Sequence, residues 1–87
     1  MKEYLNFIGG RWMPAKSGKT LESRNPANGE LGGVVPDSGA DDVNAAVDAA
    51  ARAFEKWRIY PAPKRAEIIV RAVEILRARK QSLGEML

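Results

Sequence analysis

Two pairs of carboxylates are the side chains in this chain that could do acid–base chemistry. Asp41 and Asp42 are adjacent, and Glu22 and Glu30 flank a turn, so either pair could in principle serve as general acid and base. The sequence contains no cysteine and no histidine, which excludes a thiol nucleophile, an imidazole base and metal sites built on either group. A helix start and a solvated hairpin explain the carboxylates more simply, so we expect no catalytic residue.

The tripeptide Gly18-Lys19-Thr20 matches the tail of a phosphate-binding loop. That motif requires an earlier glycine and a strand–loop–helix context, and the sequence offers neither. We therefore interpret these residues as part of a polar loop, with no phosphate or cofactor bound to this chain alone.

The net charge is +3, and basic residues concentrate in the last third of the chain. A basic helix can bind phosphate backbones, but no aromatic residues interleave with these charges and no zinc or helix-turn-helix pattern accompanies them. A solvated helix face is the simpler explanation, so we predict no nucleic-acid partner. The basic residues concerned are Lys64, Arg65, Arg71, Arg77, Arg79 and Lys80.

Length and composition limit what the chain can be. Its 87 residues form one domain at most, and a chain of this size buries only about 60% of its unfolded surface, so its own core is marginal. No apolar run is long enough to cross a bilayer, and the first residues lack the apolar core of a signal peptide. We therefore expect a cytoplasmic protein with no membrane partner.

Residues 1–36 are expected to form two β-hairpins. Gly9-Gly10 separates two short aromatic-rich runs and suits a type I′ turn, which needs positive φ at both central positions. The second pair of strands flanks N-P-A-N-G-E at positions 25–30, where proline and Asn28-Gly29 favour reversal of the chain. Gly32 and Gly33 in the returning strand predict a bulge or a close backbone approach.

Two amphipathic helices follow, over residues 37–58 and 63–80, and residues 81–87 begin a third. Ser38 or Gly39 can cap the first helix, whose acidic first turn suits the helix dipole. Pro63 suits the first position of the second helix. The local fold is therefore α+β. We expect Trp12, Phe54 and Trp57 to be core residues, with Trp57 and the helix stripes buried against residues that are absent from this chain. An apolar set beginning just where the chain stops suggests that it is part of a longer protein.

The order of these motifs is specific. F-I-G-G-R-W is followed by S-G-K-T, N-P-A-N-G-E, V-P-D-S-G-A-D-D-V-N-A-A-V-D-A-A-A-R-A-F-E-K-W and P-A-P-K-R-A-E-I-I-V-R-A-V-E-I-L. This order resembles the N-terminal opening of the aldehyde dehydrogenase superfamily, over nearly the whole chain. The resemblance implies an α/β parent with a Rossmann-like cofactor domain, of which residues 1–87 are an N-terminal fragment.

The resemblance also implies an activity for the parent. Family members oxidise an aldehyde to a carboxylic acid with NAD or NADP, and many are homo-oligomers. Their catalytic and nicotinamide-binding residues fall beyond Leu87, so the chain alone is expected to be inactive. The aldehyde, and the choice between NAD and NADP, stay open.

A monovalent cation site is implied as well, because several family members hold Na⁺ or K⁺ beside the strand before the N-P turn. The matching positions are the Ser23 hydroxyl and the Arg24 carbonyl. The alternative is that Ser23 is an ordinary strand residue.

Two rival functions follow from the residues themselves. The chain could be a small non-enzymatic interaction module that binds a partner through its amphipathic helices, or a basic nucleic-acid-binding domain. The fragment of a longer enzyme is the preferred interpretation.

Overall fold

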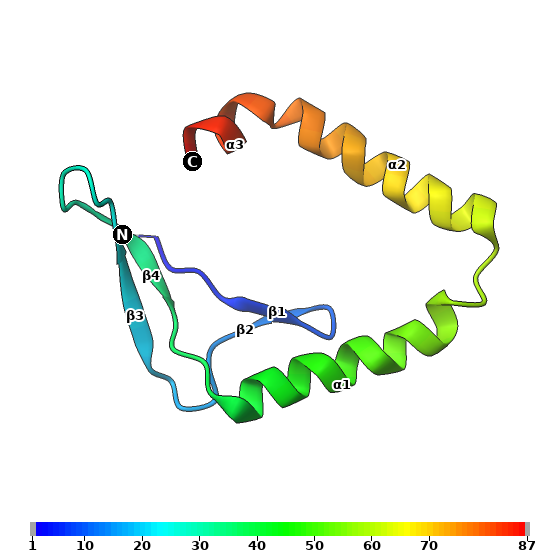
Figure 1. Ribbon diagram of the computed structural model, residues 1–87, viewed down its shortest axis with the longest axis horizontal. Coiled ribbons are helices and arrows are strands. Elements are labelled where there is room, and N and C mark those ends of the chain that lie inside the picture. Colours follow the sequence, from blue (N-terminus) through cyan, green and yellow to red (C-terminus); the bar gives the residue numbers. More distant parts are fainter. Residues whose placement is uncertain (1, 87) are drawn as a thin grey trace. The chain divides into compact units, whose positions relative to one another are not determined.

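The computed structural model describes residues 2–86, and Figure 1 shows their elements in chain order. The expected α+β composition is confirmed, with two hairpins followed by helices. The chain divides into two compact units, Met1–Ala53 and Phe54–Leu87, which are described separately. The elements are β1 (Asn6–Ile8), β2 (Arg11–Met13), β3 (Thr20–Arg24), β4 (Leu31–Pro36), α1 (Ala40–Trp57), α2 (Ala62–Ala78) and α3 (Lys80–Met86).

The first hairpin, β1–β2, turns at the predicted glycine pair. The strands are antiparallel with Phe7 opposite Trp12, and φ is 60° at Gly9 and 80° at Gly10. Two consecutive positive φ values are what a type I′ turn requires, so this prediction is confirmed. The turn also lies against α1, because a Cβ added at Gly9 would stand 3.9 Å from the Cβ of Ala49.

The second hairpin, β3–β4, forms a separate two-stranded sheet and carries the predicted bulge. Ser23 pairs with Gly33, whereas the next residue, Arg24, pairs with Leu31. Gly32 is therefore the extra residue on β4, as expected of a bulge. The strand runs one residue further than predicted and includes Pro36.

Residues 2–4 run parallel to β4, which the sequence did not predict. The Tyr4 amide donates to the Val34 carbonyl and the Val34 amide donates to the Lys2 carbonyl, both at 2.9 Å. Glu3 and Val34 form the corresponding bridge. The buried Gly33 makes this approach possible, since a Cβ there would lie 2.7 Å from the Tyr4 ring and 2.8 Å from the Lys2 carbonyl oxygen.

Helix α1 begins at Ala40, later than the predicted residue 37, and ends at Trp57, one residue early. The delay has a local cause. Of the two predicted caps, Gly39 takes the role: its carbonyl accepts from the Asp42 and Val43 amides. The Ser38 hydroxyl instead accepts a hydrogen bond of 2.7 Å from the Asn6 side-chain amide.

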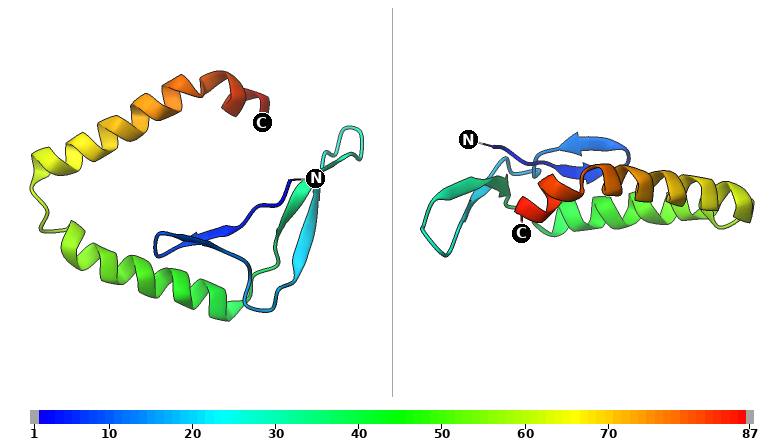
Figure 2. Two further views of the ribbon diagram at one scale, coloured as in Figure 1. Left: turned by 180° about the vertical axis from the view of Figure 1, so that it is seen from behind. Right: turned by 90° about the horizontal axis from the view of Figure 1, so that it is seen from above.

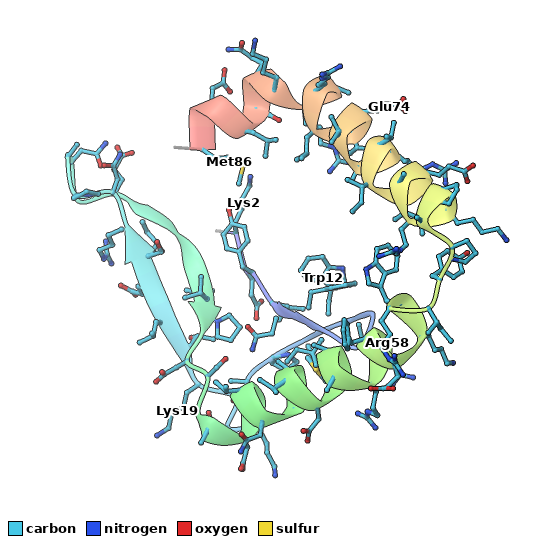
Figure 3. All side chains as sticks on the ribbon, turned by 45° about the vertical axis from the view of Figure 1, so that its right-hand side comes forward. Lys2, Trp12, Lys19, Arg58, Glu74 and Met86 are labelled. Atoms are coloured by element: carbon cyan, nitrogen blue, oxygen red, sulfur yellow. The ribbon has the colours of Figure 1, made fainter. Side chains whose placement is uncertain are left out.

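The second unit contains α2 and α3, which Figure 2 shows from two sides. Helix α2 starts one residue before the predicted 63, so Pro63 occupies its second position and not its first. It ends at Ala78, two residues early, because Arg79 leaves helical geometry with φ −103° and ψ 14°. Helix α3 then starts at Lys80. Figure 3 labels Arg58 and Glu74 among the side chains of this unit.

Little apolar surface is buried within the described residues. Ala15, at 2% exposure, is the buried hydrophobic residue among them. The three aromatic residues expected as core are exposed within this chain, at 68% for Trp12, 56% for Phe54 and 37% for Trp57, so their burial against further protein stays a prediction. Trp12, labelled in Figure 3, instead forms a tilted pair with Phe7 at 4.8 Å between ring centroids. The large apolar side chains of the helical stripes are therefore mostly exposed within their own units.

Candidate functional site

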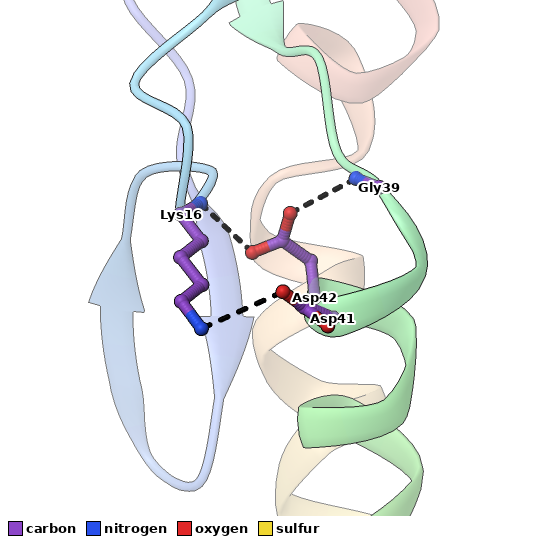
Figure 4. Close-up of polar contacts among 4 residues, drawn as sticks. All are labelled: Lys16, Gly39, Asp41 and Asp42. Carbon is purple, nitrogen blue, oxygen red and sulfur yellow. Dashed lines mark hydrogen bonds and ion pairs between the residues drawn. The ribbon is translucent and has the colours of Figure 1, made fainter.

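The carboxylate of Asp42 connects the start of α1 to the loop after β2, as Figure 4 shows. One oxygen, Oδ2, accepts a hydrogen bond of 2.9 Å from the Gly39 amide. The other, Oδ1, accepts one of 2.9 Å from the Lys16 amide, 26 positions earlier in the chain. The first bond is the return half of a capping box, with Gly39 as the cap residue. The second fixes the hairpin's exit loop to the helix.

The hydrogen bonds have an electrostatic consequence. The Gly39 amide first and the Lys16 amide second hold the pKa of Asp42 below its ordinary value of 3.8, because both stabilise the ionised form. The Lys16 ammonium adds a smaller effect in the same direction. Asp42 is therefore a carboxylate at neutral pH, positioned at the positive end of the α1 dipole.

Asp41 contributes less than Asp42 to the stability of the helix start. Its Oδ2 lies 3.5 Å from the Lys16 Nζ, and both side chains are more than two-thirds exposed. Exposed pairs of this kind are screened by water and stabilise a fold only weakly. The two aspartates thus serve the helix start, as the simpler interpretation predicted, and Asp42 offers no basic, unpartnered oxygen to a substrate proton.

The two residues of the other carboxylate pair, Glu22 and Glu30, have different hydrogen-bond partners. Glu22 accepts two hydrogen bonds on one oxygen from Arg24, 2.7 Å from Nη2 and 3.1 Å from Nε. The Arg24 Nη1 also donates to the Gly29 carbonyl at 3.1 Å. The guanidinium therefore ties β3 to the turn that follows it. Glu30 pairs instead through its backbone, whose carbonyl accepts from the Asn25 amide at 2.8 Å.

The turn at residues 25–30 is built from its own hydrogen bonds. The Asn25 side chain accepts from the Ala27 amide and the Asn28 side chain accepts from the Glu30 amide, each at 2.9 Å. These are Asx turns, in which a side-chain oxygen replaces a backbone acceptor. Gly29 alone takes positive φ, at 74°, whereas Asn28 does not. The side chains of Asn25 and Asn28 are therefore used in hydrogen bonds that stabilise the turn.

The Gly18-Lys19-Thr20 segment does not form a phosphate-binding loop. Gly18 closes a turn by donating to the Ala15 carbonyl at 2.9 Å, and Thr20 begins β3. A phosphate loop needs a helix at that point, so the structure agrees with the polar loop that was predicted.

Residues 2–86 contain no group of three or more acidic side chains arranged to hold a metal ion. Over the same residues, no helix combines the length and apolarity needed to cross a bilayer. Ser23 and Arg24 lie at the bulge of the second hairpin, where β3 changes register.

The contact that sequence reasoning missed is the bond from the Lys16 amide to Asp42. Its donor is a backbone group, which any residue type supplies, so the sequence carries no signal for it. The arrangement as a whole positions strands and a helix.

Comparison with known proteins identifies what this scaffold belongs to. A sequence profile described as "Aldehyde dehydrogenase family" matches residues 12–87. Malonate-semialdehyde dehydrogenase 1 of Geobacillus kaustophilus (strain HTA426) is 42% identical over 81 residues, which cover 93% of this chain and 17% of that protein.

Two solved structures show the same local fold. The crystal structure of an E. coli NADP dependent enzyme matches with a TM-score of 0.91 at 36% identity, covering 95% of this chain and 17% of that chain. The crystal structure of an NAD-dependent aldehyde dehydrogenase from Sinorhizobium meliloti matches with a TM-score of 0.89 at 30% identity. This match covers 94% of this chain and 17% of that chain. The chain thus spans about 17% of the length of these relatives. With a profile match over residues 12–87 and the resemblance carried by its ordered motifs, the chain belongs to the aldehyde dehydrogenase family.

Proposed function

We propose that these 87 residues serve as the N-terminal part of the cofactor-binding domain of an NAD(P)-dependent aldehyde dehydrogenase. The observation that carries this proposal is the match itself, which covers 93% of this chain but only 17% of a named semialdehyde dehydrogenase. The reaction of the whole protein would be oxidation of an aldehyde to a carboxylic acid. A semialdehyde is a reasonable first substrate to test, because the relative is named for one.

The role of this segment in that reaction is structural. The chain has no cysteine, so the nucleophile must come from another segment. What the segment supplies is a hairpin anchored to a helix through Asp42 and two helices whose apolar side chains are exposed. Exposed stripes of this kind suit burial against further protein.

A chimera tests the proposal directly. Residues 1–87 would replace the matching segment of the Geobacillus kaustophilus enzyme, and NADH or NADPH formation would be measured with malonate semialdehyde. We expect an active chimera, and no activity from the 87 residues alone. The matched control is a chimera carrying the same composition in scrambled order over residues 1–87, which should not fold. A folded chimera without activity, or aldehyde oxidation by the 87 residues alone, would contradict the proposal.

We also propose that Ser23 and Arg24 contribute oxygens to a monovalent cation site in the assembled protein. A hydroxyl and a backbone carbonyl are hard ligands suited to Na⁺ or K⁺. The positive charge of Arg24 is compensated by Glu22 at 2.7 Å, which reduces its repulsion of a nearby cation.

The cation proposal is tested by melting the chimera in NaCl, KCl and choline chloride at equal ionic strength. An ion at ten times its Kd stabilises the folded state by about 1.4 kcal/mol, which shifts the melting temperature upward. The Ser23→Ala chimera should lose most of that shift. Equal melting temperatures in all three salts would contradict the proposed cation site. Assembly into a homo-oligomer and a cytoplasmic location, both expected from the sequence, stay predictions.

A further inference from the structure

The dipeptide Asn28-Gly29 places an asparagine side chain before a backbone nitrogen that no Cβ hinders. The amide nitrogen that follows an asparagine can attack the side-chain Cγ, and glycine allows this attack best because its backbone dihedrals are the freest. The chain's other asparagines precede a residue with a Cβ, or proline, which has no N–H. They are found in Asn6-Phe7, Asn25-Pro26 and Asn44-Ala45. Asn28 is therefore the asparagine of this chain most open to that attack.

The reaction of such a pair needs no reagent other than water. The Gly29 nitrogen forms a bond to Asn28 Cγ and gives up its proton, while the bond from Cγ to Nδ2 breaks and ammonia leaves with that proton. The product is a succinimide ring. Water then opens the ring at either carbonyl: cleavage of the new bond to Cγ gives aspartate, and cleavage of the original peptide bond gives isoaspartate. In sum, an amide is hydrolysed to a carboxylate and ammonia, with nothing oxidised or reduced.

Water reaches this turn, because residues 25–30 are all exposed, yet both reacting groups are engaged in hydrogen bonds. The Gly29 amide donates to the Asn25 carbonyl at 2.7 Å, and Asn28 Oδ1 accepts from the Glu30 amide at 2.9 Å. The nitrogen must lose its proton to act as a nucleophile, and a carbonyl acceptor favours the protonated form instead. Movement of the Asn28 side chain toward the nitrogen would also strain the bond from Glu30.

The arginine at the end of β3 holds Gly29 from outside the turn. Arg24 Nη1 donates to the Gly29 carbonyl at 3.1 Å, and Glu22 fixes the guanidinium with bonds of 2.7 and 3.1 Å. The amide and the carbonyl of Gly29 are thus both held. Rotation of Gly29 toward Asn28 therefore requires breaking a charge-assisted hydrogen bond as well.

We propose that Asn28 is a site of spontaneous conversion to aspartate and isoaspartate, and that the hydrogen bonds made across the turn by Asn25, Glu30 and Arg24 slow this conversion in the folded protein. The conversion matters for the hairpin, because isoaspartate carries the main chain through its own Cβ and Cγ and so lengthens the turn. The Asn25 amide donates to the Glu30 carbonyl at 2.8 Å across this turn, and a longer main chain disrupts that pairing.

The first test compares the folded chimera with a peptide of residues 20–36 at the same mildly alkaline pH. The peptide is the unfolded reference, because an isolated two-stranded hairpin is marginally stable at best. Peptide mapping by mass and chromatography follows aspartate and isoaspartate at each asparagine. We expect product at Asn28 and not at Asn25 in the peptide, and formation at least about fivefold slower in the folded chimera, since two ordinary hydrogen bonds must break. Equal rates in the two, or product at Asn25 as fast as at Asn28, would overturn the proposal.

This test rests on the proposed function only in using the chimera, whose folding is measured by far-UV ellipticity and not by activity. A folded but inactive chimera counts against the proposed function and still reports the rate at Asn28. In urea, or if the chimera does not fold, Asn28 should react at the rate of the peptide, and slow reaction in unfolded protein would overturn a role for the turn. Asn28→Gln is the chemical control, because its longer side chain closes a ring far more slowly and the product should disappear.

The second test releases the turn without altering Asn28 or Gly29. Arg24→Ala should speed product formation about threefold or more in the folded chimera, because the bond to the Gly29 carbonyl is lost, and should leave the peptide's rate unchanged. Lys19→Ala is the control of equal charge, since none of the turn's hydrogen bonds involves its side chain. With ellipticity preserved, no acceleration in Arg24→Ala, or equal acceleration in Lys19→Ala, would overturn the proposal.

Discussion

Truncation of Phe54 should have very different costs in the 87-residue chain and in a complete enzyme. The Phe54 side chain is 56% exposed, so less than half of it is shielded from water. Full burial of such a side chain contributes about 1.5–3 kcal/mol, so the shielded part of Phe54 leaves about 0.7–1.3 kcal/mol to lose in this chain. If the remaining segments of an aldehyde dehydrogenase cover the stripe, Phe54→Ala becomes a core truncation that costs about 3–5 kcal/mol.

The assay is urea unfolding followed by far-UV ellipticity, on the 87-residue chain and on the chimera described above, each with and without Phe54→Ala. Glu55→Ala is the control, because Glu55 is an exposed neighbour and should change stability by no more than about 0.5 kcal/mol in either protein. The test depends on the difference between the stability lost on Phe54→Ala in the chimera and the stability lost in the 87-residue chain. A loss in the chimera no larger than in the chain would refute the inference that the α1 stripe is buried by further protein.

Two further predictions concern the hairpins and their anchor. Since the pKa of Asp42 lies below 3.8, its carboxylate stabilises the fold above that value and this stabilisation is lost as pH falls through the lower folded pKa. Asp42→Asn should therefore flatten the acid end of the stability curve, measured as urea midpoint against pH, and an unchanged curve would contradict the anchor. Gly10→Ala should cost about 1–2 kcal/mol, because φ is 80° there and a Cβ meets nothing within 4 Å, so backbone strain is the whole effect. Gly10→Asn should recover part of that loss in the same unfolding measurement, and equal losses for both would argue against a type I′ turn.

The sequence predicted best where local backbone chemistry decides the structure. Two adjacent glycines between aromatic runs specify a type I′ hairpin, because glycine permits the positive φ that this turn needs. Gly32 marks the bulge, because glycine has no side chain to pack there. The acidic first turn located the start of α1 to within three residues. The error there came from Ser38, whose hydroxyl binds Asn6 and not the helix.

The sequence could not predict contacts made by backbone groups over long separations. The Lys16 amide reaches Asp42 without any mark in residue type. For the bond from the Val34 amide to Lys2, Gly33 indicated a close backbone approach but not which segment makes it. Exposure of Phe54 and Trp57 within this chain agrees with the expectation that the helical stripes bury against residues outside it, although periodicity predicts which face is apolar and does not show what covers that face.

The approach of the first turn to α1 has a consequence for how the family's sequences vary. A Cβ at Gly9 would lie 3.9 Å from that of Ala49, so the two positions share one small volume at ordinary contact distance. An alanine side chain at position 9 would therefore touch Ala49 without a clash. Because φ is 60° at Gly9, backbone conformation limits position 9 more than space does, so we expect glycine, asparagine or aspartate there and a small residue at position 49 in an alignment of aldehyde dehydrogenases.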